Sequence, residues 1–393
     1  MAFSEHLAQT SPYPMGLEIE KAEGCYLYDT KGKRYLDLIA GLAVANIGHR
    51  HPEVLSAIKH QMDKHLHVIP YGEFEQSIQN TLADQLCSIL PSGLDCSYFV
   101  NSGTEANEAA LKLAKRLTGR HDIVAIRGSY HGATHGSLSV TGNEIKKQAF
   151  RPLLPGITFV HQNNLEELSL IGQETAAVII EPVLGDAGVR IPSKDYLMKL
   201  RERCNEVGAQ LIFDEVQTGF GRTGKMFAFE HWGVVPDILT IAKAFGGGMP
   251  IGAFISSKEK MNTLTHSPVL GHITTFGGHP VSCASALATI NVLVRENWIQ
   301  EAEEKGQLFK QRLTHKDIVE VRQIGLMIAV EMTSEELVIK TINNLLKKGV
   351  VGFYFLSCRN AFRIAPPLCI SSEEVNWACQ QILSAIEGAA AEC

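Results

Sequence analysis

The sequence predicts an α/β fold, with a large domain built on a mostly parallel sheet and a smaller α+β domain beside it. Short and almost entirely apolar runs recur through the middle of the chain, at residues 98–100, 123–126, 157–160, 176–180 and 211–213. Amphipathic stretches lie between them, and the one over 196–207 has Ser193 as its candidate N-cap and Gly208 as its stop. This alternation is typical of parallel strands that are covered by helices on both faces.

Three segments form the predicted domain organisation. Residues 1–45 are predicted to form short strands and turns that pack with a small C-terminal domain, residues 295–393. That domain begins with a charged helix over 296–313. Residues 46–294, where the apolar runs lie, are predicted to form the large domain.

The first segment contains a predicted hairpin. Its strands, 24–28 and 34–38, flank the turn residues 29–33, which include Asp29 and Gly32. In the C-terminal domain a further strand is expected at 328–330, after the charged helix.

The composition is that of a folded protein without a nucleic-acid partner. The 393 residues include 36 Lys and Arg against 42 Asp and Glu, a net charge of −6, with 45% hydrophobic residues. A net charge this small, with this share of hydrophobic residues, argues against a disordered chain. Binding to nucleic acid through a broadly basic surface is also excluded, because it needs clustered Lys and Arg, and no such run occurs.

The cysteines and the chain's apolar stretches indicate a cytoplasmic protein that does not cross a membrane. Nine cysteines are scattered without C-x-x-C spacing, which favours reduced thiols over a zinc site, and we expect no metal. The N-terminus has no apolar run of the secretory type. The longest uncharged stretch, 267–294, is interrupted by glycines, histidines and Pro280.

Polar residues follow the apolar run 98–100. Asn101–Glu105 opens an amphipathic helix, and Ser102 with Glu105 fits a capping box. A small-residue loop at a helix N-terminus also directs free N–H groups and the positive dipole end toward an anion such as phosphate. A plain helix cap and a phosphate site both remain open on this motif alone.

Further polar residues follow three of the other runs. Tyr130-His131-Gly132 comes after 123–126, Glu181 directly follows 176–180, and Asp214 directly follows 211–213. An acid at the end of a buried strand needs a partner to offset its desolvation. Because side chains alternate along a strand, Asp214 and Val216 are expected on one side and Glu215 on the other.

A glycine-rich motif follows Asp214 without the context that it needs. Residues 219–224 match G-x-G-x-x-G, but neither an apolar helix nor an acid-tipped second strand follows. A turn-rich loop is therefore favoured over a dinucleotide site, and an NAD-dependent oxidoreductase stays as a weak alternative.

Lys243 follows the largely apolar residues 238–242 and precedes three glycines. Desolvation at such a position lowers the pKa of a lysine and makes its amine nucleophilic, although a lysine that reaches solvent at a strand end is the simpler interpretation. A buried lysine, a buried acid, an aromatic ring and a phosphate loop together describe a site for pyridoxal 5′-phosphate (PLP).

At these residues the chain resembles the class III aminotransferases, PLP enzymes of fold type I. The resemblance covers residues 15–385, and the most specific block runs from 211 to 252, LIFDEVQTGFGRTGKMFAFEHWGVVPDILTIAKAFGGGMPIG. It implies transamination by a ping-pong mechanism in a homodimer whose active sites lie at the interface. A small-molecule amino donor would give its amine to a 2-oxo acid such as 2-oxoglutarate or pyruvate.

The resemblance implies two catalytic residues. Lys243 would form the Schiff base with the cofactor and then move a proton as general base and acid. Asp214 would pair with the protonated ring nitrogen of the cofactor.

It also implies the residues that hold the cofactor. Ser102, Gly103 and Thr104 would bind the phosphate, and Thr275 would reach the phosphate of the neighbouring subunit's cofactor. The other residues would surround the ring or its hydrogen-bond network: Tyr130 and Val216 on opposite faces, Gln217 at the phenolic oxygen, and His131 and Glu181 nearby.

The substrate pocket departs from the family pattern. Ala133 stands where members acting on acetylornithine, ornithine or 4-aminobutyrate commonly carry an arginine that holds a carboxylate. Arg363 keeps the family's other arginine, which would bind the carboxylate of the 2-oxo acid. Asp186 replaces the glutamate that pairs with it in many relatives, and Tyr71 is a further specificity candidate. We therefore expect a terminal-amine or broad donor.

Two alternatives share the cofactor. One is a PLP-dependent aminomutase or decarboxylase of the same family, and the other is a PLP-binding protein without catalysis.

Overall fold

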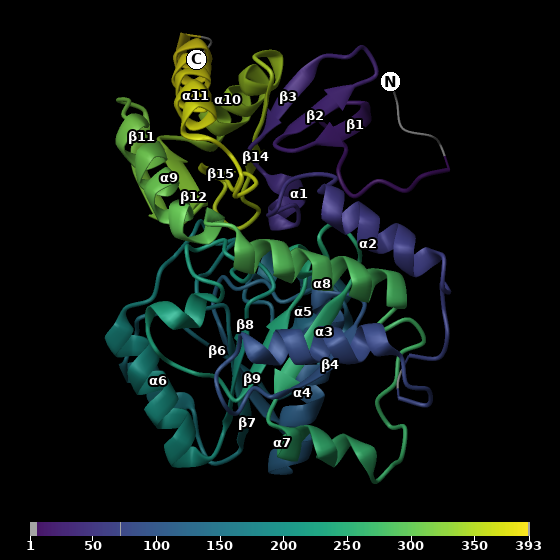
Figure 1. Cartoon of the computed structure of the whole chain (residues 1–393). Helices are drawn as coiled ribbons and strands as arrows, with labels where there is room; N and C mark the ends of the chain where they lie inside the picture. The colour runs from purple at the N-terminus through teal and green to yellow at the C-terminus, as the bar shows by residue number, and fades with distance from the viewer. Residues whose placement is uncertain (1–5, 71, 392–393) are drawn as a thin grey trace.

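The computed structural model describes residues 6–70 and 72–391 (Figure 1). Among them a seven-stranded sheet has the order β4-β10-β9-β8-β7-β5-β6. The strand bounds are β4 Cys96–Val100, β5 Asp122–Ile126, β6 Ile157–Val160, β7 Thr175–Ile180, β8 Gln210–Asp214, β9 Ile238–Ile241 and β10 Gly252–Ser256. Within this sheet β10 is antiparallel to both of its neighbours, and the other adjacent pairs are parallel. The predicted α/β fold with a mostly parallel sheet is confirmed.

Alternate side chains of the sheet enter two different cores. Leu211 and Phe213 belong to the core shared with α6 (Lys194–Val207) and α8 (Pro280–Arg295), whereas Ile212 packs with the buried face of α4 (Gly103–Thr118). Period-2 alternation of apolar side chains explains why almost every position of these strands is apolar. Further helices of this part are α2 Pro52–Met62, α3 Ser77–Ser88, the short α5 His135–Ser139 and α7 Lys258–Asn262.

The local signals for α6 are confirmed. The Ser193 hydroxyl accepts a hydrogen bond from the Tyr196 N–H at 3.2 Å, and Gly208 ends the helix in the left-handed conformation, with φ of +71°. A side chain at that backbone angle would be strained, so glycine is favoured there.

Two smaller sheets form the upper part of the molecule in Figure 1, where the N-terminal and C-terminal segments lie side by side. One has the order β1-β2-β3-β13 (Ile19–Glu23, Tyr26–Asp29, Arg34–Asp37, Val350–Val351), and the other has the order β11-β12-β15-β14 (Ile318–Ile324, Met327–Met332, Ala361–Ile364, Phe353–Tyr354). The helices of this part are α1 Ala40–Ala43, α9 Trp298–Arg312, α10 Glu335–Lys347 and α11 Ser372–Ala391. Parallel pairing of β3 with β13 joins the first 45 residues to the C-terminal part, while the domain boundaries themselves stay a prediction.

The predicted hairpin is β2–β3, an antiparallel pair whose turn is held by Asp29. The Asp29 carboxylate accepts hydrogen bonds from the N–H groups of Lys31 and Lys33, both at 2.9 Å.

Two elements differ from the prediction. The strand β10 was not predicted, because it is short and begins on a glycine just after a glycine-rich turn. The charged helix begins at Trp298 rather than at 296, since Glu296 has an extended backbone and ends α8.

No helix in the described parts of the chain combines the length and apolar character that crossing a membrane requires. Over the same residues, no three His, Cys, Asp or Glu side chains come together in a way that could hold a metal ion.

Candidate active site

A cavity of about 470 Å³ lies at the carboxyl ends of the parallel strands. Most of the candidate residues line it, from the ends of strands or the segments that follow them: Ser102, Gly103 and Thr104 after β4, Tyr130, His131 and Ala133 after β5, Glu181 after β7, Asp214, Val216 and Gln217 at the end of β8, and Lys243 after β9. The antiparallel β10 begins at this same edge, which adds Met249, Pro250 and Ile251 to the lining. Ligands of open α/β sheets bind at this edge.

One wall is the N-terminus of α4. The Ser102 hydroxyl accepts a hydrogen bond from the Glu105 N–H at 3.2 Å, as the predicted capping box requires. The reciprocal bond differs, because the Glu105 carboxylate accepts from the Asn101 N–H at 2.6 Å. A Cβ on Gly103 would lie 2.7 Å from Val216 Cγ1, so this approach of helix to strand requires glycine. The free N–H groups of this first turn and the helix dipole form a site for an anion.

Four buried side chains, one of them the carboxylate of Asp214 at the end of β8, are joined by hydrogen bonds. We call Thr240, Asn107, Asp214 and His131 the acid network. The Thr240 hydroxyl donates to Asn107 Oδ1 at 2.7 Å, and Asn107 Nδ2 donates to Asp214 Oδ2 at 2.7 Å. His131 Nδ1 lies 2.8 Å from the same oxygen. Asp214 Oδ1 accepts the Val216 N–H at 3.0 Å, so both carboxylate oxygens are fixed.

Lys243 lies in the same cavity in an unusual backbone conformation. Its φ is +47°, a region that a residue with a side chain seldom adopts, and such strain is typical of functional sites. Burial lowers the pKa of the Lys243 ammonium, although the charges of Asp214 and Glu181 oppose this effect. Its Nζ donates to Gln217 Oε1 at 3.4 Å. A buried amine with a lowered pKa is available as a nucleophile and a base.

The Glu181 carboxylate binds backbone N–H groups of two neighbouring loops. It accepts the Tyr130 N–H at 2.8 Å and the Gly185 N–H at 3.0 Å. Burial raises the pKa of Glu181 to about 7. It therefore fixes the loop that carries Tyr130 and His131.

Two of the substrate candidates form an ion pair. Arg363 Nη2 lies 3.1 Å from Asp186 Oδ1, and Lys146 Nζ contacts Asp186 Oδ2. We call Lys146, Asp186 and Arg363 the charge cluster. Lys146 Nζ lies 4.7 Å from the centre of the Tyr130 ring, which places the cluster beside the cavity.

The remaining candidates have different positions. Thr275 is exposed and does not line the cavity. Tyr71 lies outside the described residues.

Sequence reasoning missed Asn107 and Lys146. Asn107 is a polar residue at a buried position of α4, one turn after Gly103, and an amide within an apolar helix face is a detectable signal. Lys146 follows no strand and gives no comparable signal.

The glycine-rich residues 219–224 form a packed loop, as predicted. Arg222 is buried and donates to the carbonyls of Leu326 at 2.9 Å and Pro366 at 2.7 Å. A Cβ on Gly221 would lie 2.7 Å from Leu368 Cδ1. No open phosphate loop for a dinucleotide exists at these residues.

The cavity fits PLP on three observations. The helix N-terminus offers N–H groups for a phosphate, Asp214 holds a fixed and buried carboxylate, and Lys243 brings a buried amine to the same space. An anion site, an acid and an amine are the groups that PLP requires.

Comparison with known proteins agrees with this chemistry. The family model described as aminotransferase class-III matches residues 8–386. A thermostable (S)-enantioselective omega-transaminase from Thermomicrobium roseum is 32% identical, with a TM-score of 0.91 over 98% of this chain and 96% of that one. A PLP-bound amine transaminase from an uncultivated Pseudomonas species is 29% identical, with a TM-score of 0.89 over 100% and 99%. Ornithine aminotransferase from Toxoplasma gondii is 28% identical, with a TM-score of 0.91 over 99% and 93%.

Proposed function

The chain belongs to the class III aminotransferase family, and from this premise we propose that it transfers the amine of a donor lacking a distal carboxylate to a 2-oxo acid. It is a PLP-dependent transaminase of fold type I. The proposal therefore concerns the substrates and the residues that serve them.

Bound PLP supplies an electron sink that stabilises negative charge at the substrate α-carbon. Ser102, Gly103 and Thr104 at the N-terminus of α4 would hold its phosphate. Tyr130 and Val216 would lie against its ring.

Lys243 would bind the cofactor covalently and then act as the proton carrier. Its Nζ would take a proton from the substrate α-carbon and later release it to the cofactor as the amine is transferred. The lowered pKa of Lys243 favours the neutral amine that accepts this proton.

Asp214 would keep the ring nitrogen of the cofactor protonated. Hydrogen bonds from Asn107 and His131 hold its carboxylate in one orientation, and a fixed, buried charge acts more strongly than one exposed to water. Gln217 would donate to the phenolic oxygen of the ring.

The donor proposal rests on Ala133. This residue lines the cavity where relatives that act on ornithine-type substrates commonly carry an arginine, and its methyl group cannot bind a carboxylate. Apolar side chains of Val44, Met249 and Ile251 line the same cavity. A terminal amine with an apolar substituent fits such a wall.

Arg363 would bind the α-carboxylate of the acceptor. It is a buried cation with one hydrogen bond among the described residues, to Asp186, and within them its buried Nε has no hydrogen-bond partner. A guanidinium with unused donors is suited to a carboxylate.

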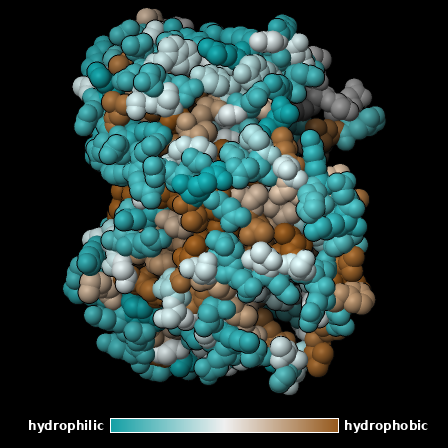
Figure 2. Space-filling view, viewed as in Figure 1, coloured by the Kyte–Doolittle hydropathy of each residue, from teal (hydrophilic) through white to brown (hydrophobic). Residues whose placement is uncertain are grey.

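We infer a homodimer in which Thr275 serves the partner's site. Large apolar side chains are exposed on two segments, at Leu66 and Phe74 and at Val269, Leu270 and Phe276. Figure 2 also shows apolar side chains gathered across the middle of one face, where α2 and α8 lie. Exposed apolar patches are typical of interaction surfaces.

A cytoplasmic location is proposed from the thiols. The eight cysteines in the described ranges are free, and the Sγ atoms of Cys25 and Cys369 lie 3.5 Å apart, in hydrogen-bond contact and without a disulfide. Oxidising compartments favour disulfides.

A panel of amines with pyruvate and 2-oxoglutarate as acceptors tests the proposal. We expect turnover with terminal amines that lack a distal carboxylate, and little with ornithine or 4-aminobutyrate, which carry one. If the carboxylate-bearing donors react best, the donor proposal is wrong.

A further inference from the structure

The two oxygens of the Asp186 carboxylate are bound by different groups. Oδ2 contacts Lys146 Nζ and accepts the Ser357 hydroxyl at 2.8 Å. Oδ1 accepts the Leu356 N–H at 3.2 Å and an Arg363 N–H at 3.1 Å. Three of its four partners would therefore remain if Arg363 moved away.

Arg363 is held much less completely than Asp186. Within residues 6–70 and 72–391 it makes a single hydrogen bond, to Asp186, and its Nε has no partner. Its guanidinium carbon also lies 4.5 Å from the centre of the Phe355 ring. Arg222 gives the contrast: it is also buried, but it donates to Asn46 Oδ1 at 2.5 Å as well as to two carbonyls. The Nε of Arg222 also has no hydrogen-bond partner among the described residues, but three hydrogen bonds hold its guanidinium, against one for Arg363.

We propose that Lys146 is a positioning and specificity-determining residue, which keeps the Asp186 carboxylate paired while Arg363 turns to the carboxylate of the incoming 2-oxo acid. A buried carboxylate that loses its last cation is strongly destabilised. While Lys146 stays bound to Asp186, the release of Arg363 leaves this buried carboxylate paired with a cation. The free-energy cost of releasing Arg363 is then smaller, so the carboxylate of the acceptor can replace Asp186 as its partner. This inference rests on the proposed function, because it assigns a role in acceptor binding at the same site.

The electrostatics of Asp186 support this role. Burial acts to raise the pKa of Asp186, but Lys146, through charge and a hydrogen bond, outweighs it together with Ser357 and Arg363, and the pKa lies below its ordinary value. Lys146 is therefore the stronger of the two cations in keeping Asp186 ionised. Many relatives carry a glutamate in place of Asp186. Here the shorter side chain binds Arg363 through Oδ1, and Lys146 contacts its other oxygen, Oδ2.

The test compares Lys146→Gln and Lys146→Arg with the wild-type holoenzyme. We expect Lys146→Gln to raise the KM for both pyruvate and 2-oxoglutarate about tenfold, as for the loss of one charged hydrogen bond. The reaction with the amine donor alone should keep its rate, since that donor does not need Arg363. Lys146→Arg should restore most of the acceptor affinity.

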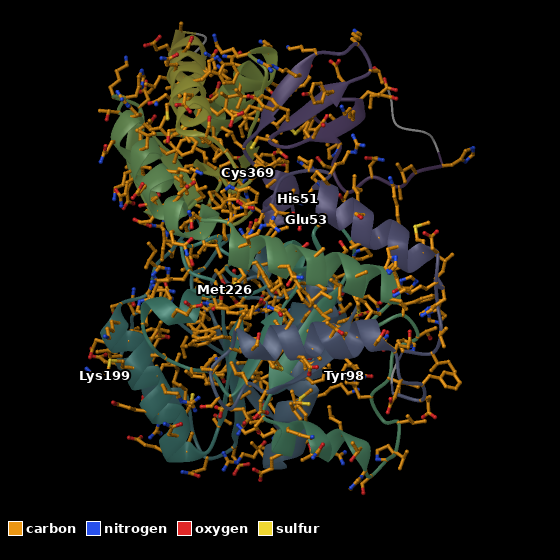
Figure 3. The ribbon with its side chains drawn as sticks, in the orientation of Figure 1. His51, Glu53, Tyr98, Lys199, Met226 and Cys369 are labelled. Atoms are coloured by element: carbon orange, nitrogen blue, oxygen red, sulfur yellow. The ribbon has the colours of Figure 1, made fainter. Side chains whose placement is uncertain are left out.

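Lys199→Gln is the matched control. This lysine also forms an ion pair, with Asp195 at 2.9 Å, but it lies on α6 at the edge of the molecule in Figure 3 and does not line the cavity. Its KM values should equal those of the wild type.

A binding measurement separates this inference from the proposed function. Calorimetric titration with glutarate, a dicarboxylate that cannot be transaminated, should show about tenfold weaker binding to Lys146→Gln. If the wild type fails to turn over any 2-oxo acid but binds glutarate in a Lys146-dependent way, the proposed function falls and this inference stands.

Three results would overturn the inference. A KM that rises for 2-oxoglutarate and not for pyruvate would mean that Lys146 binds the distal carboxylate directly. Unchanged KM values would mean that Asp186 needs no second cation. A slower reaction with the donor would mean that the substitution only disturbs the structure.

Discussion

The acid network and the charge cluster each hold a buried carboxylate beside one cavity, but they hold it differently. Asp214 is fixed by uncharged donors and a histidine at 2.7–3.0 Å, all carried by strand ends and α4. Asp186 lies between two cations, and one of them, Arg363, keeps an unpaired donor. The first arrangement suits a charge that must stay in place, and the second suits a partner that must be exchanged during the reaction.

The largest effect is expected at Lys243, which lines the cavity. Lys243→Ala removes the covalent link and the proton carrier, so kcat should fall by about 10⁴-fold. The visible absorbance of the bound cofactor should change with it, and an absorbance spectrum together with a turnover assay checks both. A variant that keeps both the spectrum and turnover would remove Lys243 from its role.

A smaller loss of activity is expected for substitutions within the acid network. Asp214→Asn keeps the shape but removes the charge, and kcat should fall about 10²- to 10³-fold, as when one fixed electrostatic contact to the reacting group is lost. Thr240→Val removes only the distant hydroxyl, so it should cost a few-fold in kcat. If the two variants lose equal activity, the network acts only through packing. Single-turnover kinetics with a saturating donor measure this step.

A substitution in the charge cluster should change the binding of the acceptor rather than the rate of the chemical step. Arg363→Ala should raise the KM for 2-oxoglutarate by about 100-fold, the loss of a charged contact to a carboxylate. Asp186 keeps Lys146, Ser357 and the Leu356 N–H, so the fold should tolerate the change. Steady-state kinetics with varied acceptor check it, and an unchanged KM would exclude Arg363 from acceptor binding.

The smallest effect on turnover is expected at Glu215, a buried acid beside Asp214 that faces away from the cavity. Its carboxylate accepts the Thr218 hydroxyl and the N–H groups of Ala228 and Phe229, and burial raises its pKa to about 7. Because the folded state holds this proton more tightly than the unfolded chain, its contribution to stability is present below about pH 4.5. The contribution is lost as the pH rises through 7, by about 3 kcal/mol.

Glu215→Gln removes this titration. Urea unfolding at pH 5 and pH 8 should show a smaller fall in stability for the variant than for the wild type. Equal falls would mean that the pKa of Glu215 is not raised in the folded protein.

The acid network could be predicted in part from the sequence, and the charge cluster hardly at all. Asp214, His131 and Lys243 each follow a strand, and the carboxyl ends of parallel strands meet at one edge, so strand-end residues converge without further information. Lys146 lies 40 residues before Asp186 and Arg363 lies 177 residues after it, on β15 of a smaller sheet, so only the folded chain brings these partners together.

The fold shows the same division. Continuous apolar runs predicted six strands of the central sheet, while β10 was missed because a five-residue strand that begins on a glycine resembles a turn. Its antiparallel direction, which brings Met249–Ile251 to the cavity, depends on pairing with β4 and β9 and not on its own residues.

The most direct test of the account follows the two half-reactions separately. The PLP-loaded protein, freed of excess cofactor, is mixed with a terminal amine and no acceptor, and its visible absorbance is recorded before a 2-oxo acid is added. We predict that the amine alone bleaches the absorbance once per active site and that the 2-oxo acid restores it. A protein that turns over repeatedly without any 2-oxo acid, as an aminomutase or decarboxylase would, or one whose absorbance never changes, would contradict the account.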